Sequence, residues 1–506
     1  MEEYAVEFLN VTYQYSDYAK AAIRDITLNI RKGEFVLFTG VSGCGKTSIA
    51  RCINGLIPHF HEGTISGHIK VMGYDTAELS INDIGKKVGS VFQDPKSQFF
   101  MTDTTSEVAF GCANMALPRE EIWKRTDNGF RQMNIETLKD RSVFILSSGE
   151  MQKVAVASCY AMEPEIYIFD EPSANLDIQS IRELTQIMGT LKARKKTVIV
   201  FEHRLFYLAD LFDRMIFMDK GVIRQEFENK SAIELSDSRL SQMGTRSFDL
   251  QKLTPKEQKH KLPNVGKTLL EIENISFHYS SEKNTHHESA VLKDLNFTAN
   301  AGEVIGIVGE NGAGKTTLAR VCCGLLKESA GMIKINGMRI APKNRLGNLY
   351  FVMQDSDYQL FSDSVWNELT IGKRKKEADT EKNTLLLKEL GLWENRDTHP
   401  AALSRGQKQR LTIAGALIND SKILFMDEPT SGLDRNSMTC VANHLQSLAD
   451  NGRLVFVVTH DYEFLLSACD RILYLKNGSI QEDFPLTIQT KDNLLNILWK
   501  GGGLFE

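Results

Sequence analysis

The chain has 506 residues, of which 42% are hydrophobic and 25% charged, values typical of globular proteins rather than of disordered or fibrous ones. The 60 Lys and Arg residues against 65 Asp and Glu give a formal net charge of -5, without the basic excess of nucleic-acid-binding proteins, so we expect no nucleic-acid partner. A chain this long exceeds what one hydrophobic core usually supports, and it predicts at least two domains.

Cysteine usage and hydropathy indicate the compartment. The eight cysteines are scattered, with no C-x-x-C pair and no Cys/His cluster at metal-ligand spacing, which favours a reducing environment. The longest apolar runs, such as 35–38 and 423–426, are strand-sized and far shorter than the roughly 18 residues that span a bilayer. The acidic N-terminal sequence lacks the basic start and apolar core of a secretory signal. We therefore expect a cytoplasmic protein without a membrane span.

The first strong motif follows the apolar run at 35–38. This run leads into G-x-x-x-x-G-K-T and then a helix-like pattern, the strand, loop and helix order of a phosphate-binding loop. Glycines let successive backbone N–H groups face the phosphates, and the helix N-terminus adds its positive dipole. Lys46 is predicted to hold the β- and γ-phosphates and Thr47 to reach Mg²⁺. The other predicted nucleotide-binding residues of this loop are Gly40, Ser42, Gly43, Gly45 and Ser48.

The next motif is IYIFDEP, at 166–172. Its apolar run predicts a buried parallel strand that ends in two carboxylates. Asp170 is predicted to support Mg²⁺, and Glu171 to polarise the attacking water. A glycine-rich turn and a solvated acidic turn are the ordinary alternatives for these two motifs, and the recurrence of both motifs along the chain disfavours them.

The chain then repeats itself after a polar stretch. Residues 229–266 have few large apolar side chains and no sustained periodicity, and they predict a linker between domains at 1–228 and 267–506. The sequence FLNVTYQYS recurs as IENISFHYS, and GVSGCGKTSIAR recurs as GENGAGKTTLAR. A constant offset relates later landmarks of the two copies, such as Glu171 to Glu428. The first copy is longer near 58–67. Such a register identifies an internal duplication.

The second copy therefore carries its own predicted site. The run at 304–308 precedes its phosphate loop, in which Lys315 and Thr316 take the roles of Lys46 and Thr47. ILFMDEP supplies Asp427 for Mg²⁺ and Glu428 for the attacking water. Its other predicted nucleotide-binding residues are Gly309, Asn311, Gly312, Gly314 and Thr317.

LSSGE at 146–150 and LSRGQ at 403–407 complete a set of motifs by which the chain resembles the ATP-binding cassette (ABC) ATPases over both copies. The resemblance implies an α/β fold with two P-loop NTPase nucleotide-binding domains. Each would have a mainly parallel core sheet, a small antiparallel β subdomain and a helical subdomain. It also implies an ATPase whose cofactors are ATP and Mg²⁺.

The same resemblance implies roles for single residues. Gln93 and Gln354 become Q-loop residues that act in catalysis and contact the metal, and His203 and His460 become catalytic switch histidines. The remaining roles are adenine stacking by Tyr15 and Tyr279, D-loop positions at Asp177 and Asp434, and signature contacts to the γ-phosphate by Ser147, Gly149, Ser404 and Gly406.

In the family, each signature faces the nucleotide of the opposite domain. We therefore expect intramolecular pairing, in which Lys46 works with Ser404 and Gly406, and Lys315 works with Ser147 and Gly149. ATP binding would close the pair, and hydrolysis would reopen it.

The signatures also depart from the family pattern. Ser148 and Arg405 replace the first of two adjacent glycines, and Glu150 replaces the usual Gln in the first copy. Because both glutamates and both histidines are present, the sequence predicts two competent sites.

The surroundings of the Q-loops are similar to one branch of the family. VFQDPKSQFF at 91–100, VMQDSDYQLF at 352–361, the segment 55–69 and the FEHR form of the switch resemble the cobalt and energy-coupling factor (ECF) branch. In that branch vitamins or transition-metal ions are imported, and this region receives helices of a transmembrane coupling subunit. The resemblance implies that coupling subunit and a separate substrate-binding membrane subunit as partners, with this chain peripheral at the inner face of the cell membrane.

Two other readings stay open at this point. A tandem ATPase of a sugar importer has similar length and layout, but that group usually shows a degraded second site. Ribosome-acting cassette proteins also carry two domains, but with a longer and more charged helical linker. The predicted linker here is mixed in charge and contains Pro255 and Pro263, which argues against a long rigid helix.

Overall fold

The computed structural model describes residues 3–16, 20–174, 176–256, 267–279, 290–354, 356–371, 380–430 and 432–499. The chain divides into two compact units, built around residues 1–249 and 250–506, which we call the first unit and the second unit. Within the described ranges, no helix combines the length and the apolar character that a membrane crossing requires.

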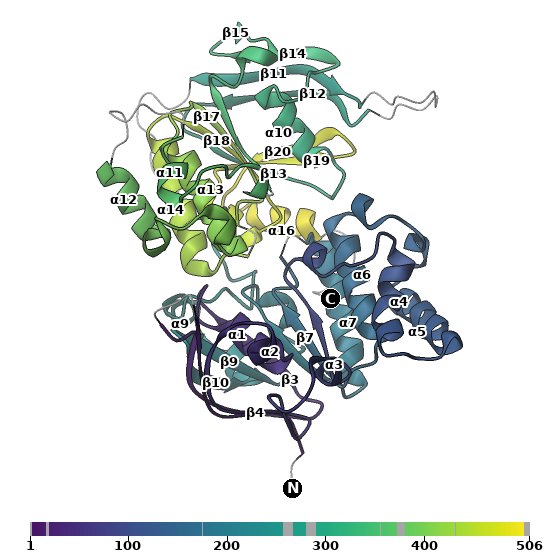
Figure 1. Cartoon of the computed structure of the whole chain (residues 1–506). Coiled ribbons are helices and arrows are strands. Elements are labelled where there is room, and N and C mark those ends of the chain that lie inside the picture. The colour runs from purple at the N-terminus through teal and green to yellow at the C-terminus, as the bar shows by residue number, and fades with distance from the viewer. Residues whose placement is uncertain are drawn as a thin grey trace. The chain divides into compact units, whose positions relative to one another are not determined.

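The first unit contains two sheets (Figure 1). A four-stranded antiparallel sheet has the order β2-β1-β4-β5, with bounds Ile23–Arg31, Tyr4–Tyr15, Gly63–Val71 and Tyr74–Asp75. A six-stranded sheet has the order β10-β9-β3-β8-β7-β6, with bounds Val222–Glu228, Arg214–Asp219, Phe35–Gly40, Thr197–Phe201, Ile166–Asp170 and Val88–Val91. All pairings in the larger sheet are parallel except that of β9 with β10. The continuous burial of β3 and β8 is what a sheet covered on both faces requires.

Helix α1 of the first unit packs against β3, β7 and β8. Helices α4, α5 and α6 pack on one another as a helical group, seen together at one side of the unit in Figure 1. Asp103 caps α4 by accepting from Ser106 N, and Asp177 caps α7 in the same way. The bounds are Lys46–Ile53 (α1), Leu56–His59 (α2), Ile81–Gly85 (α3), Thr104–Asn114 (α4), Arg119–Gln132 (α5), Ser148–Ala161 (α6) and Ile178–Ala193 (α7), with 3₁₀ turns at Pro95–Ser97, Glu136–Leu138, Val143–Ile145 and Phe206–Leu208.

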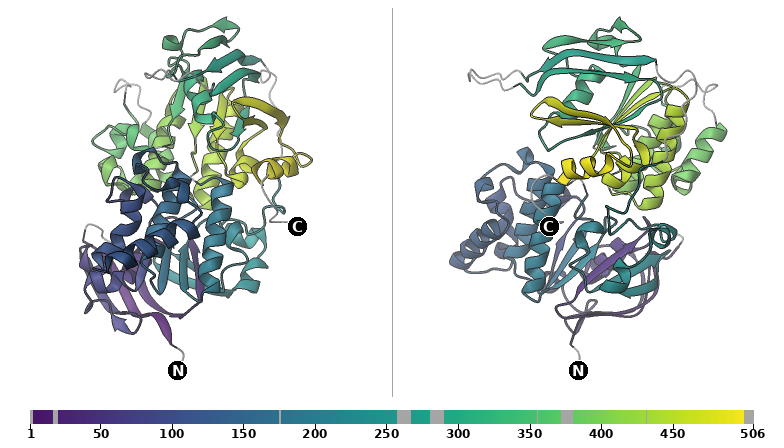
Figure 2. Two further views of the ribbon diagram at one scale, coloured as in Figure 1. Left: turned by 90° about the vertical axis from the view of Figure 1, so that its right-hand side faces the viewer. Right: turned by 180° about the vertical axis from the view of Figure 1, so that it is seen from behind.

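The second unit repeats both sheets. Its antiparallel sheet has the order β12-β11-β14-β15, with bounds Leu292–Asn300, Thr268–Phe277, Ala330–Ile335 and Met338–Arg339. Its six-stranded sheet has the order β16-β17-β18-β13-β19-β20, with bounds Leu349–Val352, Ile423–Asp427, Leu454–Val458, Val304–Val308, Arg471–Lys476 and Ser479–Pro485. Strands β19 and β20 form the antiparallel pair at one edge, drawn in yellow in Figure 2.

The helices of the second unit follow the same chain order. Their bounds are Lys315–Cys323 (α10), Val365–Glu368 (α11), Thr380–Glu389 (α12), Arg405–Ile418 (α13), Arg435–Asp450 (α14), Tyr462–Ala468 (α15) and Lys491–Trp499 (α16), with 3₁₀ turns at Pro342–Asn344, Ser356–Tyr358, Trp393–Asn395 and Pro400–Ala402. The predicted α/β class, with two domains that each carry a sheet with parallel strands and an antiparallel sheet, is confirmed.

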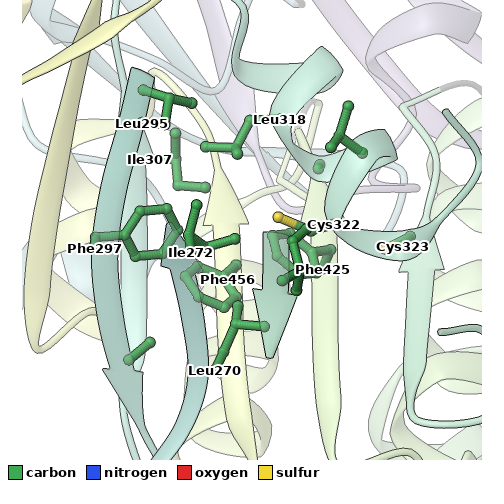
Figure 3. Close-up of a cluster of buried hydrophobic side chains, with 14 of the residues drawn as sticks. Leu270, Ile272, Leu295, Phe297, Ile307, Leu318, Cys322, Cys323, Phe425 and Phe456 are labelled. Atoms are coloured by element: carbon green, nitrogen blue, oxygen red, sulfur yellow. The ribbon is translucent and has the colours of Figure 1, made fainter. Parts of the chain in front are cut away.

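The core of the second unit lies between its two sheets and α10. Side chains from β11 and β12 meet those of β13, β17 and β18 there, and Figure 3 shows Phe297, Leu318, Phe425 and Phe456 within this cluster. The rings of Phe425 and Phe456 stack with centroids 4.4 Å apart. An equivalent cluster fills the first unit. Burial of this surface fixes the phosphate-loop helix against the strands.

Strand order places the predicted site residues at one edge of each larger sheet. Strand β3 is parallel to β8, and β8 is parallel to β7, so their carboxyl ends point the same way. The segments that follow β3, β7 and β8 therefore meet at that edge. In the second unit β13, β18 and β17 have the same relation.

The predicted linker, 229–266, contains ordered segments. Helices α8 (Asn229–Ile233) and α9 (Asp237–Gln242) follow β10, and Phe248 packs against Phe212 with ring centroids 5.6 Å apart. Residues 257–266 lie outside the described residues, and the domain boundaries at 228/229 and 266/267 stay a prediction.

Lys256 at the end of this segment belongs to the second unit. Its ammonium lies 3.1 Å from Asp470 Oδ1 and donates to Ala468 O at 2.7 Å, and its N–H bonds Leu466 O. Asp470 in turn accepts from Val304 N at 2.9 Å, at the start of β13. In the first unit Asp213 accepts from Phe35 N at 2.9 Å and pairs with Lys192 of α7 at 2.7 Å. The two equivalent aspartates are thus paired with lysines from different places. Lys192 of α7 pairs with Asp213 in the first unit, and Lys256 of the segment before β11 pairs with Asp470 in the second.

Candidate active sites

The first and last glycines of both G-x-x-x-x-G motifs have a positive φ. Gly40 has φ 149° and Gly45 has φ 105°, and a Cβ at Gly40 would lie 2.2 Å from Met218 O. Gly309 repeats this closely, with φ 154° and a Cβ position 2.2 Å from Leu475 O. Only glycine fits such positions. Ser42, Gly43, Asn311 and Gly312 lie in these two loops, directly before α1 and α10.

The two loop lysines are buried and already turned into their loops. Lys46 Nζ donates to Gly40 O at 3.1 Å, and Lys315 Nζ donates to Gly309 O at 2.7 Å and to Glu310 O at 2.9 Å. Lys46 Nζ also lies 3.3 Å from His203 Nε2. A buried ammonium beside a glycine-rich loop at a helix N-terminus makes each loop a site for a polyanion.

The strand-end aspartates lie beside the loop threonines. Thr316 Oγ1 donates to Asp427 Oδ2 at 2.7 Å, and Thr47 makes the equivalent bond to Asp170. Burial and then the charge of Glu171 raise the pKa of Asp170 to about 7, and burial raises that of Asp427. Asp170 Oδ1 is buried without a hydrogen-bond partner among the described residues. A carboxylate in this state is stabilised by a nearby cation.

These oxygens fit Mg²⁺. One carboxylate and one hydroxyl per site are the hard ligands that Mg²⁺ takes from a protein when substrate phosphates and water supply the rest. Over the described part of the chain, no group of three or more His, Cys, Asp or Glu side chains is arranged to hold a metal alone. The pair of oxygen donors therefore suits an ion that arrives with the nucleotide.

The glutamates that follow share an unusual backbone conformation. Glu171 has φ 47° and Glu428 has φ 48°, a region that costs a non-glycine residue roughly 1–3 kcal/mol. Glu171 N donates to Phe201 O at 2.8 Å, and Glu428 N donates to Val458 O at 2.8 Å. These bonds tie each glutamate to the end of the neighbouring strand, two residues before His203 or His460.

The carboxylates of these glutamates meet different partners. In the first unit Gln93 Nε2 donates to Glu171 Oε2 at 2.6 Å, and His203 Nε2 lies 3.3 Å from Glu171 Oε1. In the second unit His460 Nε2 lies 3.8 Å from Glu428 Oε1, and Gln409 Nε2 donates to the Glu428 carbonyl at 2.7 Å. Gln354 is exposed.

The signatures form helix N-termini. Ser147 caps α6 and Ser404 caps α13, each with a reciprocal capping box. Glu150 closes the first box by accepting from Ser147 N at 2.8 Å, and Gln407 closes the second at 2.9 Å. The substitution of Glu150 for Gln thus keeps the cap. Gly149 and Gly406 lie in the first turns of these helices.

The aromatic residues predicted to stack on adenine differ between the units. Tyr15 accepts from Arg51 at 2.9 Å and shares a hydrogen bond with Ser48 at 3.2 Å, so its ring is fixed over α1. Tyr279 is 52% exposed and touches Phe277 edge to face. Thr317 is buried in α10.

The structure thus gathers Lys46, Gln93, Asp170, Glu171 and His203 at one strand edge. The second unit gathers Lys315, Thr316, Asp427, Glu428 and His460 at the equivalent edge. Two further buried residues, Glu202 and Thr459, lie directly before the histidines, and that position is the only signal of them in the sequence. Such gatherings of a lysine, a carboxylate pair and a histidine suit phosphoryl transfer to water.

Known proteins give the same picture. The family model described as ABC transporter matches residues 23–174 and 292–431. A Treponema denticola protein named as an ABC transporter ATP-binding protein is 41% identical, covering 94% of this chain and 96% of the relative. Bacillus subtilis YkoD, named as an HMP/thiamine import ATP-binding protein, is 34% identical, covering 94% and 90%.

Solved structures support the fold. The archaeal ribosome recycling factor aABCE1, solved with the ribosomal stalk protein aP1, aligns with a TM-score of 0.63 over 96% of this chain and 92% of that one. At 21% identity this likeness shows the fold alone.

Proposed function

Because the chain belongs to the ABC transporter family as a tandem ATP-hydrolysing, ATP-binding protein, we propose that it energises an importer of the energy-coupling factor type. In this proposal it docks at the inner face of the cell membrane on a transmembrane coupling subunit, and a separate membrane subunit binds a vitamin or a metal ion. The name of the Bacillus subtilis relative, an HMP/thiamine import protein, supports a vitamin-type cargo.

The proposed chemistry uses equivalent residues in each unit. Lys46 and Lys315 hold the β- and γ-phosphates, which their burial beside the loop carbonyls favours. Glu171 and Glu428 orient the attacking water and accept its proton. His203 and His460, next to those carboxylates, contact the γ-phosphate.

Mg²⁺, when bound, supplies positive charge that offsets the charge on the β- and γ-phosphates. Asp170 with Thr47, and Asp427 with Thr316, would hold the ion. Gln93 and Gln354 of the Q-loops are proposed to contact it as well.

The observation that carries the docking proposal is a repeated exposed aromatic after each Q-loop. Phe100 is 73% exposed and Phe361 is 78% exposed, although both are large and apolar. Their backbone is held firmly, because Phe100 N donates to Glu107 Oε2 at 2.9 Å and Phe361 N donates to Glu368 Oε2 at 3.0 Å. Exposed aromatic side chains on a backbone held in this way suit a helix of a partner subunit.

Copurification tests this proposal. The tagged full chain is extracted in detergent from membranes of the cells in which it occurs, and the bound proteins are identified. We expect a polytopic coupling subunit and a small substrate-binding membrane protein. The double variant Phe100→Asp, Phe361→Asp should recover at least about tenfold less of both. Tyr74→Asp, at an aromatic 57% exposed on β5, should recover them as the native chain does.

Other results would contradict the proposal. Recovery of ribosomal particles in place of membrane proteins would favour the ribosome-acting reading, and recovery of sugar-transport subunits would favour the sugar-type reading. Equal recovery by the Phe100→Asp, Phe361→Asp variant would remove the proposed surface. The pairing of Lys46 with Ser404 and Gly406, and of Lys315 with Ser147 and Gly149, is part of this proposal.

A further inference from the structure

The residue before each switch histidine is buried and differs between the units. In the second unit it is Thr459, which directly follows β18 and is fully buried. Thr459 Oγ1 donates to Glu428 Oε2 at 2.9 Å and accepts from Asp461 N at 3.2 Å. A threonine hydroxyl can donate one hydrogen bond, and here the carboxylate of Glu428 accepts it.

In the first unit the same position is Glu202, whose carboxylate cannot donate a hydrogen bond to Glu171. Its Oε1 accepts from His203 N at 2.7 Å and Arg204 N at 3.1 Å. Its Oε2 accepts from Tyr207 Oη at 2.7 Å and from Ser173 N at 3.3 Å. Glu202 therefore joins the turn after β8 to the turn after β7.

The second unit makes that junction with other residues. Thr430 Oγ1 donates to Asp461 Oδ2 at 3.3 Å, and Phe464 N donates to Asp461 Oδ1 at 3.3 Å. In the second unit Asp461 thus joins the two turns, as Glu202 does in the first unit. The hydroxyl of Thr459 is therefore left to donate to Glu428. In the first unit it is Gln93, from the Q-loop, that donates to the corresponding carboxylate oxygen of Glu171.

We propose that Thr459 is a positioning residue of the second unit, whose hydroxyl fixes the Glu428 carboxylate with its other oxygen turned toward His460. The inference rests on the proposed role of Glu428 in ATP hydrolysis. One hydrogen bond to Oε2 sets the rotation of the carboxylate, and Oε1 then lies 3.8 Å from His460 Nε2. A base held in this way presents the same lone pair to water in each turnover, and displacement of about 1 Å costs up to roughly a hundredfold in rate.

The test compares Thr459→Val, which has the same shape without the hydroxyl, with Thr459→Ser, which keeps the hydroxyl. Both are made in the full chain, in the native and the Glu171→Gln backgrounds. ATPase activities of the Thr459 variants are compared in the background in which Glu428→Gln causes the larger loss of activity. Thr126→Val is the matched control, because Thr126 in α5 is also buried and its hydroxyl has no hydrogen-bond partner among the described residues.

We expect Thr459→Val to lower kcat about tenfold or more with KM for ATP within about twofold. Thr459→Ser should stay within about twofold of the parent, and Thr126→Val should match it. Melting temperatures of the soluble variants are measured in parallel, and Thr459→Ala replaces Thr459→Val if the latter does not fold.

Three outcomes would overturn the inference: an unchanged kcat in Thr459→Val, a loss in Thr459→Ser equal to that in Thr459→Val, or a rise in KM with kcat retained. If Glu428→Gln changes turnover in neither background, it is the proposed role of Glu428 that fails. A loss in Glu428→Gln without a loss in Thr459→Val contradicts only the role of Thr459.

Discussion

The first and second units hold the same glutamate with different side chains. Glu171 Oε2 accepts a hydrogen bond from Gln93, whereas Glu428 Oε2 accepts a hydrogen bond from Thr459. The backbone around them is nearly identical: φ is 47° and 48°, and in each unit the glutamate N–H donates a hydrogen bond of 2.8 Å to a carbonyl of the neighbouring strand. The duplication has therefore kept the strand-end backbone more closely than the side chains that restrain the carboxylate.

The largest effect should come from removing both glutamates. We expect Glu171→Gln, Glu428→Gln to lower ATPase kcat by roughly 10²–10⁴-fold, the usual contribution of a general base. The two single variants, assayed for steady-state phosphate release, show whether the two units contribute equally. Turnover near the native rate in the double variant would refute the prediction of two competent sites.

A second difference lies beside α10, where Arg345 donates to Val321 O at 2.8 Å. In the second unit Arg345 is fully buried and forms a two-pronged pair with Glu328, with distances of 2.7 and 3.0 Å. In the first unit Ile84 precedes β6 by the same interval as Arg345 precedes β16, and it is buried. One unit therefore fills this position with an ion pair and the other with a hydrocarbon side chain.

We expect Arg345→Ala to lower the free energy of unfolding of the second unit by about 3–5 kcal/mol at neutral pH, because Glu328 is left without its cation. Burial, the largest single influence, opposes ionisation of Glu328, but the hydrogen bonds and charge of Arg345, the backbone N–H of Glu328 and the charge of Arg339 together outweigh burial and lower the pKa of Glu328. The pair therefore stabilises fully above the unfolded pKa of about 4.3, and its contribution is lost as pH falls through the lowered folded pKa. Urea unfolding from pH 7 to pH 3 should show the difference between native and variant narrowing. A constant difference would contradict this account.

A smaller effect is expected at Tyr207, whose equivalent in the second unit is Phe464. Tyr207 donates to the buried carboxylate of Glu202 at 2.7 Å. Tyr207→Phe should destabilise the first unit by about 1.5–3 kcal/mol, the range for hydrogen bonds to charged groups. Differential scanning calorimetry measures the change. Phe464→Tyr, which adds an unmatched hydroxyl, should destabilise the second unit instead of improving it.

The smallest effect separates the two signature glycines. A Cβ at Gly149 would lie 2.5 Å from Ser180 Oγ, whereas at Gly406 the nearest atom, of Arg410, is 3.8 Å away. Gly149→Ala should therefore cost about 1 kcal/mol. Gly406→Ala should be neutral or stabilise by up to about 1 kcal/mol, since alanine favours a helix. Thermal unfolding checks both, and equal shifts in the two variants would mean that Ser180 yields without cost.

Sequence patterns predicted the backbone of the site better than its side-chain contacts. The glycines of the phosphate loops and the strand ends at Asp170 and Asp427 follow from local rules, so they were accessible from the sequence. The capping box of Ser147 and Glu150 was equally accessible, because it depends on a spacing of three residues. The capping box explains why Glu150 can replace the usual Gln of the signature.

Other features depend on elements far apart in the chain. Nothing local to Thr459 indicates that its hydroxyl reaches Glu428, because the contact arises from the pairing of β18 with β17. Nothing local to Arg345 indicates full burial, since its partner Glu328 precedes another strand. The predicted roles of all the site residues stay predictions, including those of Tyr15, Tyr279, Asp177, Asp434 and the two signatures.

The attachment of Lys256 to Asp470 has a practical consequence for cutting the gene in two. A downstream fragment that begins at 267, the predicted end of the linker, would lose the ammonium that neutralises a carboxylate bonded to the first residue of β13. A fragment that begins at Leu250 keeps that cation, together with the Gln251 and Leu253 carbonyls that Lys491 of α16 bonds at 2.6 and 2.8 Å. Residues 250–256 should therefore be included in any fragment that is meant to fold as the second unit alone.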